Sequence, residues 1–263
     1  NLCLIHIQGG EITGSIDESA RHAITKLAHY HFPSTRKAAD NIIRMGESRK
    51  NVFMLGCPSV DVVTQTPSQI DTESLNLGVG SDLDFSKEYI LILFHPVTTE
   101  YQNSELQMIE VLEAVKTFNK QILLIWPNID AGSDGVSQAV RRFREFNPEV
   151  KLHAYKNLEP DVYISLLKKA CLAVGNSSSF IRDASFIGTP IILVGSRQDG
   201  REKTDAVIRV EPNRDEIIKA ALLHEQLGAY SASELYGTVG ASRRIVNQIL
   251  KLKPYAQKRF VSL

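Results

Sequence analysis

The sequence is poor in the features that mark several classes of protein. It has three cysteines, Cys3, Cys57 and Cys171, and one tryptophan in 263 residues. An odd and sparse set of cysteines inside hydrophobic runs indicates reduced core thiols rather than a disulfide framework. No hydrophobic run reaches the roughly 20 residues that a membrane helix needs, and no signal peptide precedes the first strand-like run. We therefore expect a cytoplasmic protein without a membrane partner.

An excess of charge of either sign is also absent. Lys+Arg and Asp+Glu number 30 each, which gives a formal net charge of +0. This balance provides no bulk attraction for nucleic acid, so we expect no nucleic-acid partner. Hydrophobic residues make up 43% and charged residues 23% of the chain, which is ordinary for a globular protein and argues against a disordered chain, a fibre or a coiled coil.

Strand-like and helix-like segments alternate along most of the chain. The predicted strands are Leu2–Ile7, Asn51–Gly56, Glu88–Phe94, Gln121–Trp126, Val150–Ala154, Leu172–Gly175 and Ile191–Val194, with a short extended piece at His31–Pro33. The predicted helices are 15–29, Thr35–Met45, Ser104–Asn119, Gly135–Phe146, Asp161–Ala170, Phe180–Ile187, Arg214–Leu223 and Ser242–Leu252. Apolar strands joined by helical crossovers predict an α/β fold with doubly wound parallel sheets.

Three of these helices carry more detailed expectations. We expect Ser15 or Asp17 to cap the first helix and Thr35 to cap the second. The spacing of apolar residues predicts the inner face of the helix Ser104–Asn119, formed by Leu106, Ile109, Leu112, Ala114 and Val115.

The domain organisation follows from a change in composition. Residues 67–87 are rich in Ser, Asp, Gly and Thr and lack periodicity, so we expect a linker there between residues 1–66 and a second domain at 88–240. We expect residues 241–263 to form a C-terminal helix that can cross back to the first domain. The chain starts at Asn1 with a strand-like run, which indicates the later part of a longer protein whose first domain is incomplete here.

Candidate chemistry follows the strands, because ligands of such sheets bind beyond the carboxyl ends of the strands. Gly175–Ser179 offers hydroxyls and backbone N–H groups that suit a phosphate, although a plain helix cap has the same composition. His95 follows an apolar strand and could donate to a diphosphate or move a proton, or it could be structural. No Walker motif or Gly-x-Gly-x-x-Gly is present, which argues against ATP hydrolysis and dinucleotide redox chemistry.

Acidic and histidine clusters in the first part of the chain also admit two interpretations. Glu11, Asp17 and Glu18 could act as an acid–base set, or the two at the helix start could simply favour a helix N-terminus. His29 and His31 have no Cys or Glu partner at metal-ligand spacing, so we expect no metal.

Long ordered blocks of sequence carry a resemblance to a known family. The segment His6–His31 (HIQGGEITGSIDESARHAITKLAHYH) closely resembles the hydrolysing UDP-N-acetylglucosamine 2-epimerases of sialic acid synthesis. It looks most similar to the epimerase half of the animal bifunctional epimerase/N-acetylmannosamine kinase. Further matching blocks are His95–Thr99, Pro127–Ser133, Gly175–Ser178, Gly188–Pro190 and Arg197–Glu202. The resemblance implies two Rossmann-like domains of the GT-B type, and a homodimer or homotetramer to which the helix Ser104–Asn119 could contribute.

The resemblance also implies a reaction and its residues. UDP leaves after removal of the C2 proton, and hydration of the resulting 2-acetamidoglucal gives N-acetylmannosamine, without any metal or redox cofactor. The implied catalytic residues are Asp17 and His95, with Glu11 as a further carboxylate and Gln8 as a positioning amide where many bacterial members have Glu. The implied contacts to UDP are Asn128, Leu158, Ser177, Ser178, Asp183 and Arg197.

Two other functions remain open at this stage. One is a sister enzyme that acts on UDP-2,4-diacetamido-trideoxy sugars on the route to legionaminic acid. The other is an inactive protein that binds nucleotide sugars, because an amide such as Gln8 cannot serve as a general acid or base.

Overall fold

A computed structural model describes residues 2–70, 75 and 78–258 of the chain. It divides the chain into two compact units. The first comprises residues 1–65, 199–201 and 234–263, and the second comprises residues 66–198 and 202–233. The described residues of the segment 67–87 therefore group with the second unit, and residues 234–240 group with the first.

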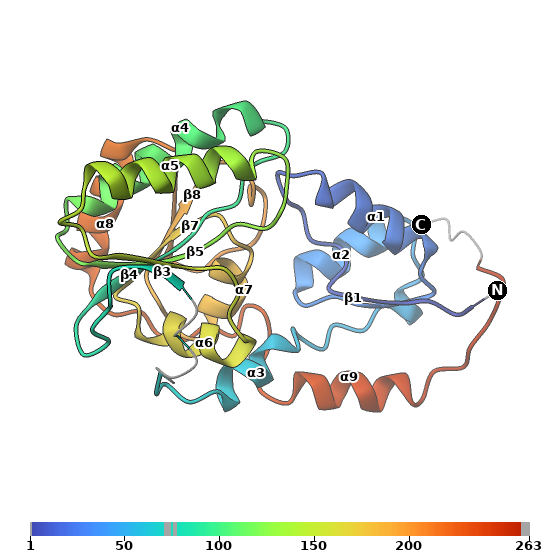
Figure 1. The fold of residues 1–263 in the computed structure, drawn as a ribbon. Coiled ribbons are helices and arrows are strands. Elements are labelled where there is room, and N and C mark those ends of the chain that lie inside the picture. The colour runs from blue at the N-terminus through green and yellow to red at the C-terminus, as the bar shows by residue number, and fades with distance from the viewer. Residues whose placement is uncertain (1, 71–74, 76–77, 259–263) are drawn as a thin grey trace. The chain divides into compact units, whose positions relative to one another are not determined.

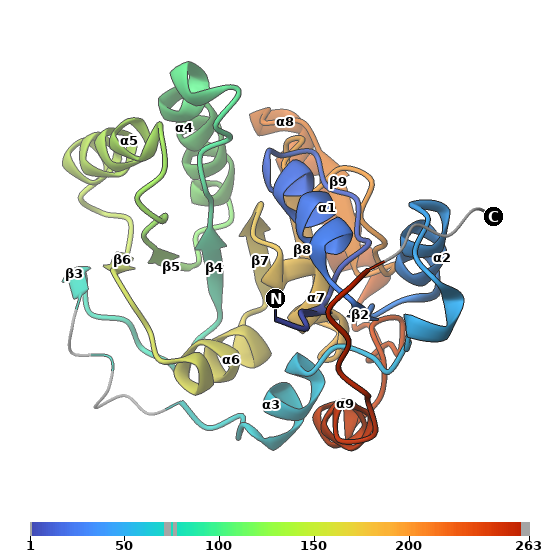
Figure 2. The same ribbon diagram turned by 90° about the vertical axis from the view of Figure 1, so that its right-hand side faces the viewer.

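The second unit is built on a mostly parallel sheet. Among the described residues the strand order is β3-β6-β5-β4-β7-β8-β9, and Figure 2 shows the strands side by side in this order. Every neighbouring pair is parallel except β3 and β6, which are antiparallel at one edge. The strands are β3 (Gly78–Gly80), β4 (Tyr89–Leu93), β5 (Gln121–Ile125), β6 (Leu152–Tyr155), β7 (Leu172–Gly175), β8 (Ile191–Val194) and β9 (Val207–Val210).

Helices cover both faces of this sheet, as Figure 1 shows. One face carries α4 (Ser104–Lys116), α5 (Ser133–Phe146) and α8 (Arg214–Leu227), and the other carries α6 (Pro160–Lys169) and α7 (Ser179–Ser185). The main hydrophobic core lies between the strands and the α4–α5–α8 layer, where Ile92, Val111 and Val140 are completely buried. No helix in the described part of the chain has the length and apolarity to cross a membrane.

Most predicted elements of the second unit are confirmed within a few residues, and β7 and β8 have the predicted bounds. The strands β3 and β9 were not predicted. The predicted inner face of α4 is wrong at Leu106, which is 61% exposed. Gln107, Met108 and Val111 are buried in its place, because the buried stripe is rotated slightly around the helix.

The first unit contains a two-stranded parallel sheet and several helices. Its strands β1 (Ile5–Ile7) and β2 (Tyr30–Phe32) pair in the register Ile5↔Tyr30. Its helices are α1 (Asp17–Leu27), α2 (Arg36–Arg44), α3 (Ser59–Gln65) and α9 (Ala241–Ile249). A small core joins Tyr30 and Phe32 of β2 to Ile245 of α9. The predicted strand Asn51–Gly56 is wrong, because this segment makes only one isolated bridge, between Val52 and His31.

The two helix starts in the first unit are stabilised in different ways. Thr35 caps α2 as predicted, and its Oγ1 accepts a hydrogen bond of 3.1 Å from the Ala38 N–H. The predicted cap of α1 by Ser15 or Asp17 is wrong, because Ile16 occupies the N-cap position and makes no side-chain cap bond. The Glu18 carboxylate instead accepts a hydrogen bond of 2.7 Å from the Thr13 N–H just before the helix.

The Thr35 cap predicts a measurable contribution to stability. We expect Thr35→Ala to lower the free energy of unfolding by about 1 kcal/mol, because it leaves the buried Ala38 N–H without its partner. Thr35→Ser keeps an acceptor oxygen at the same place and should retain most of the stability. Chemical denaturation of the three proteins measures the difference, and equal stability of Thr35→Ala and wild type would contradict this assignment of the cap.

Candidate functional site

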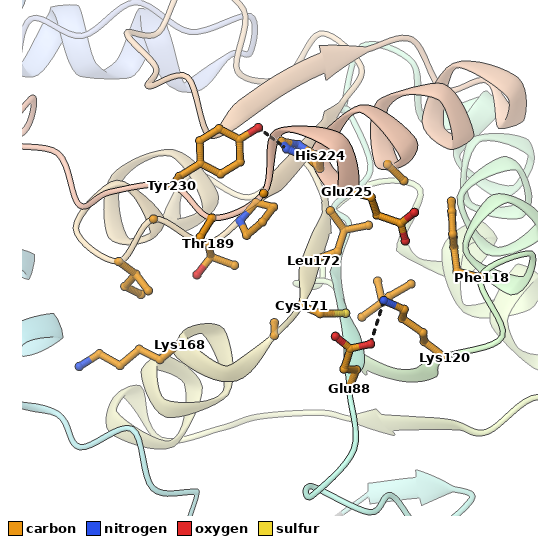
Figure 3. A pocket seen from close by; sticks show the side chains of 18 residues that line it. Glu88, Phe118, Lys120, Lys168, Cys171, Leu172, Thr189, His224, Glu225 and Tyr230 are labelled. Carbon is orange, nitrogen blue, oxygen red and sulfur yellow. Dashed lines mark hydrogen bonds and ion pairs between the residues drawn. The ribbon is translucent and has the colours of Figure 1, made fainter.

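Two cavities open on the sheet of the second unit, at opposite ends of its strands. The cavity in Figure 3 has a volume of about 410 Å³ and lies at the amino ends of β4, β7 and β8. Its side chains include Cys171 and an ion pair of 3.0 Å between Glu88 and Lys120. Ligands of parallel α/β sheets bind beyond the carboxyl ends of the strands, so we do not assign the functional site to this cavity.

The second cavity lies at the carboxyl ends of the strands and has a volume of about 1000 Å³. Segments that follow β4, β5, β6 and β7 surround it, together with residues from α5 and α6. Its polar lining residues are His95, Asn128, Ser133, Asp134, Ser137, Arg141, Lys156, Asn157, Tyr163, Ser177, Ser178, Ser179 and Arg197. Three of these side chains are cationic and one is acidic, so the cavity suits an anionic ligand.

The structure brings together the predicted catalytic residue His95 and most of the residues that the family resemblance implies for UDP binding. The second cavity is lined by His95, Asn128, Leu158, Ser177, Ser178 and Arg197. Asp183 lies in α7 and is not among its lining residues. The predicted residues Gln8, Glu11 and Asp17 belong to the first unit.

The backbone of His95 is held by the side chain of Asn176, which is fully buried. The His95 N–H donates to Asn176 Oδ1 at 2.7 Å, and Asn176 Nδ2 donates to the His95 carbonyl at 2.8 Å. The Asn176 carbonyl in turn accepts hydrogen bonds from Arg197 Nη1 at 3.3 Å and from Gln198 Nε2 at 3.1 Å. One asparagine therefore links the ends of β4 and β7 to the segment after β8.

The imidazole of His95 is kept neutral by its surroundings. Burial, and to a smaller extent the positive charge of Arg197, lowers the pKa of His95 to about 4. The Asn128 N–H points at His95 Nδ1 over 3.4 Å, which assigns Nδ1 as the acceptor and places the proton on Nε2. His95 can therefore donate a hydrogen bond near pH 7 without carrying a charge.

A chain of hydroxyl groups lines another part of the cavity. Tyr163 Oη lies 2.6 Å from Ser179 Oγ, which lies 2.8 Å from Ser177 Oγ. Arg182 Nη2 donates to Ser178 Oγ at 3.2 Å. Burial, and then the negative charge of Asp183, raises the pKa of Tyr163, so this phenol remains a hydrogen-bond donor across the physiological range.

The predicted residues of the first unit lie between the end of β1 and the first turn of α1. Gln8 directly follows β1 with a φ of 63°, and its Nε2 donates to Cys57 Sγ at 2.8 Å. Glu11 is buried and forms an ion pair of 3.1 Å with Arg201. Asp17 is exposed in the first turn of α1 and accepts a hydrogen bond from Ser15. The described residues contain no group of three or more His, Cys, Asp or Glu arranged to hold a metal ion.

Sequence reasoning did not single out several residues of the second cavity. Arg141 and Lys156 bring positive charge to it, and Tyr163 extends the hydroxyl chain that begins in the predicted phosphate segment Gly175–Ser179. Asn176 belongs to the predicted phosphate segment Gly175–Ser179, but nothing in the sequence distinguishes its amide from its serine neighbours. The only available signal was its place directly after a predicted strand.

Comparison with known proteins places the chain in a family. Residues 1–250 match the family model described as UDP-N-acetylglucosamine 2-epimerase. The UDP-N,N'-diacetylbacillosamine 2-epimerase (hydrolyzing) of Legionella pneumophila is 34% identical over 256 residues, which are 97% of this chain and 66% of the relative. A UDP-N-acetylglucosamine 2-epimerase of Neisseria meningitidis is 30% identical over 265 residues, with coverages of 98% and 68%. The chain thus spans just under two thirds of the Legionella relative.

A solved structure supports the fold independently of sequence identity. The crystal structure of UDP-GlcNAc 2-epimerase from Neisseria meningitidis bound to UDP-GlcNAc aligns with a TM-score of 0.75 at 17% identity, covering 95% of this chain and 70% of that one. Together with the parallel-dominated sheets, this likeness confirms the expected α/β fold of the GT-B type. On the family match and the two relatives, the chain belongs to the UDP-N-acetylglucosamine 2-epimerase family.

Proposed function

We propose that the protein is a hydrolysing 2-epimerase of UDP-linked acetamido sugars, and that its substrate is a UDP-2,4-diacetamido-trideoxy sugar. The observation that carries the nucleotide-sugar part is the cavity at the carboxyl ends of β4–β7, where His95, Ser177 and Arg197 converge. The relatives' names favour the diacetamido sugar, because the Legionella relative at 34% identity is named for UDP-N,N'-diacetylbacillosamine.

The cavity has the properties that a departing diphosphate requires. Arg197 offers a permanent positive charge, and the His95 Nε2–H and the seryl hydroxyls offer neutral donors. Donors already in place where negative charge develops are the largest source of rate enhancement in many enzymes. In this proposal Asn128 and Leu158 contact the nucleoside. The ribose contact of Asp183 stays a prediction from the family resemblance, because Asp183 does not line this cavity.

The proposed reaction has two balanced steps. A carboxylate removes the C2 proton while the C1–O bond to the diphosphate breaks, which releases UDP and leaves a C1–C2 double bond. Water then adds to C1 and a proton returns to C2 from the opposite face, which gives the free sugar with inverted C2. Both proton transfers require a general acid or base.

The carboxylates of the first unit are the proposed acid–base residues. Glu11 forms an ion pair with Arg201, and Asp17 is an exposed carboxylate at the start of α1. Gln8 cannot transfer protons, so its proposed role is to position the substrate. Its left-handed backbone and its bond to Cys57 fix the direction of its amide.

The second candidate substrate is UDP-N-acetylglucosamine, which would give N-acetylmannosamine for sialic acid synthesis. The Neisseria relative, named for that sugar nucleotide, supports it at 30% identity. The similarity to the animal bifunctional enzyme, the homodimer or homotetramer and the cytoplasmic location also remain predictions.

A direct assay separates the two substrates. We expect the full-length protein to release UDP and a 2-epimerised sugar from UDP-N,N'-diacetylbacillosamine faster than from UDP-N-acetylglucosamine. NMR of the products in D₂O identifies the sugar and shows deuterium incorporated at C2, which reports removal of the C2 proton. Faster turnover of UDP-N-acetylglucosamine would select the second candidate. Binding of UDP without turnover of either compound would support an inactive binding protein.

The role of His95 is testable by substitution. We expect His95→Ala to lower kcat by about 10²–10⁴-fold, because the leaving diphosphate loses a positioned hydrogen-bond donor. His153 on β6 is a suitable control, since its ring bonds the Ser81 carbonyl and does not line the cavity. His153→Ala should leave kcat of the folded protein nearly unchanged. Near-normal activity of His95→Ala would show that His95 is merely structural.

A further inference from the structure

We propose that Asn176 is a positioning residue for catalysis, which acts by fixing the His95 backbone and thereby the direction in which its ring donates. This inference rests on the proposed function. Asn176 itself does not line the cavity. Its effect on the reaction would pass entirely through His95, which does.

The geometry of the contact restricts which side chain can occupy this position. The Asn176 amide oxygen accepts a hydrogen bond of 2.7 Å from the His95 N–H, and its NH₂ group donates one of 2.8 Å to the His95 carbonyl. These two bonds replace the next rung of the β4–β7 ladder beyond the pair Leu93↔Gly175. A glutamine is one methylene longer, and an aspartate has no donor for the His95 carbonyl. Asparagine therefore fits this place in both length and hydrogen-bonding pattern.

The contact bears directly on the ring of His95. With its backbone fixed on both sides, the residue presents Nδ1 to the Asn128 N–H and leaves Nε2 to carry the proton. The ring is buried beside Arg197, and its lowered pKa of about 4 keeps it neutral. Loss of the Asn176 amide would free the His95 backbone and admit water, so the ring would lose its single tautomer.

The main chain and the side chain of Asn176 perform separable tasks. Arg197 and Gln198 donate to the Asn176 main-chain carbonyl, not to its amide. Asn176→Ala keeps this carbonyl and removes only the bonds to His95. The structure therefore predicts a loss in kcat with little change in KM, because the cation that attracts the diphosphate keeps its hydrogen bond.

The test compares two substitutions at Asn176 with a matched control. Asn176→Ala removes the amide, and Asn176→Asp keeps its size but sets a carboxylate against the His95 carbonyl. The control is Asn147, another buried asparagine of the same unit, whose Nδ2 donates to the Phe143 carbonyl at the end of α5. We expect both Asn176 variants to lower kcat by about 100-fold, a typical effect of misplacing a catalytic group. Asn147→Ala should reduce thermal stability and leave kcat nearly unchanged.

A spectroscopic measurement tests the role without turnover. In protein labelled with ¹⁵N-histidine, wild-type His95 should show the Nε2–H tautomer and titrate near pH 4, with its signal assigned by comparison with His95→Gln. In both Asn176 variants the tautomers should mix and the pKa should rise toward about 6.5. A folded variant with an unchanged His95 spectrum and unchanged kcat would overturn the inference. Failure of the wild type to turn over either sugar nucleotide would contradict the proposed function. The spectra would still show whether Asn176 fixes the tautomer and the pKa of His95.

Discussion

The parallel pairing of β4 with β7 is the constraint on which the candidate site depends. At the last rung, Leu93↔Gly175, a Cβ on Gly175 would stand 2.0 Å from the Leu93 oxygen, and the glycine has a φ of +151°. Only glycine permits this approach. The next residue, Asn176, then hydrogen-bonds the His95 backbone directly, so the close packing of two strands also fixes the position of His95.

The sequence predicted those parts of the fold that local pattern determines. The central strands are apolar throughout because helices cover both faces of the sheet. Continuous apolar runs such as Leu172–Gly175 can therefore be predicted as strands from the sequence. The rule that ligands bind beyond the carboxyl ends of parallel strands then selected His95, Asn128, Ser177 and Arg197, which all line one cavity. The positions of these residues follow from the strand ends, and the strands can be predicted from their continuous apolar pattern.

The parts that sequence did not predict depend on neighbours rather than on local pattern. β3 is a Gly-Val-Gly segment whose residues are all exposed, and only its antiparallel pairing with β6 makes it a strand. Asn51–Gly56 has strand-like composition, yet it finds a partner only at Val52. Asn176 belongs to the same group, because its importance comes from a contact across 81 positions of the chain. No spacing rule connects residues that far apart.

The electrostatics of the cavity divide two tasks between two residues. A protonated His95 next to Arg197 would place like charges together in a buried site, and the structure avoids this by keeping the imidazole neutral. Arg197 supplies the charge, since a guanidinium does not lose its proton in proteins. His95 supplies a directed donor whose protonation does not change between pH 6 and 8, because its pKa lies near 4. Under the proposed function, attraction of a diphosphate and orientation of its oxygens would be tuned separately, and fixing the histidine backbone through Asn176 would affect only the second.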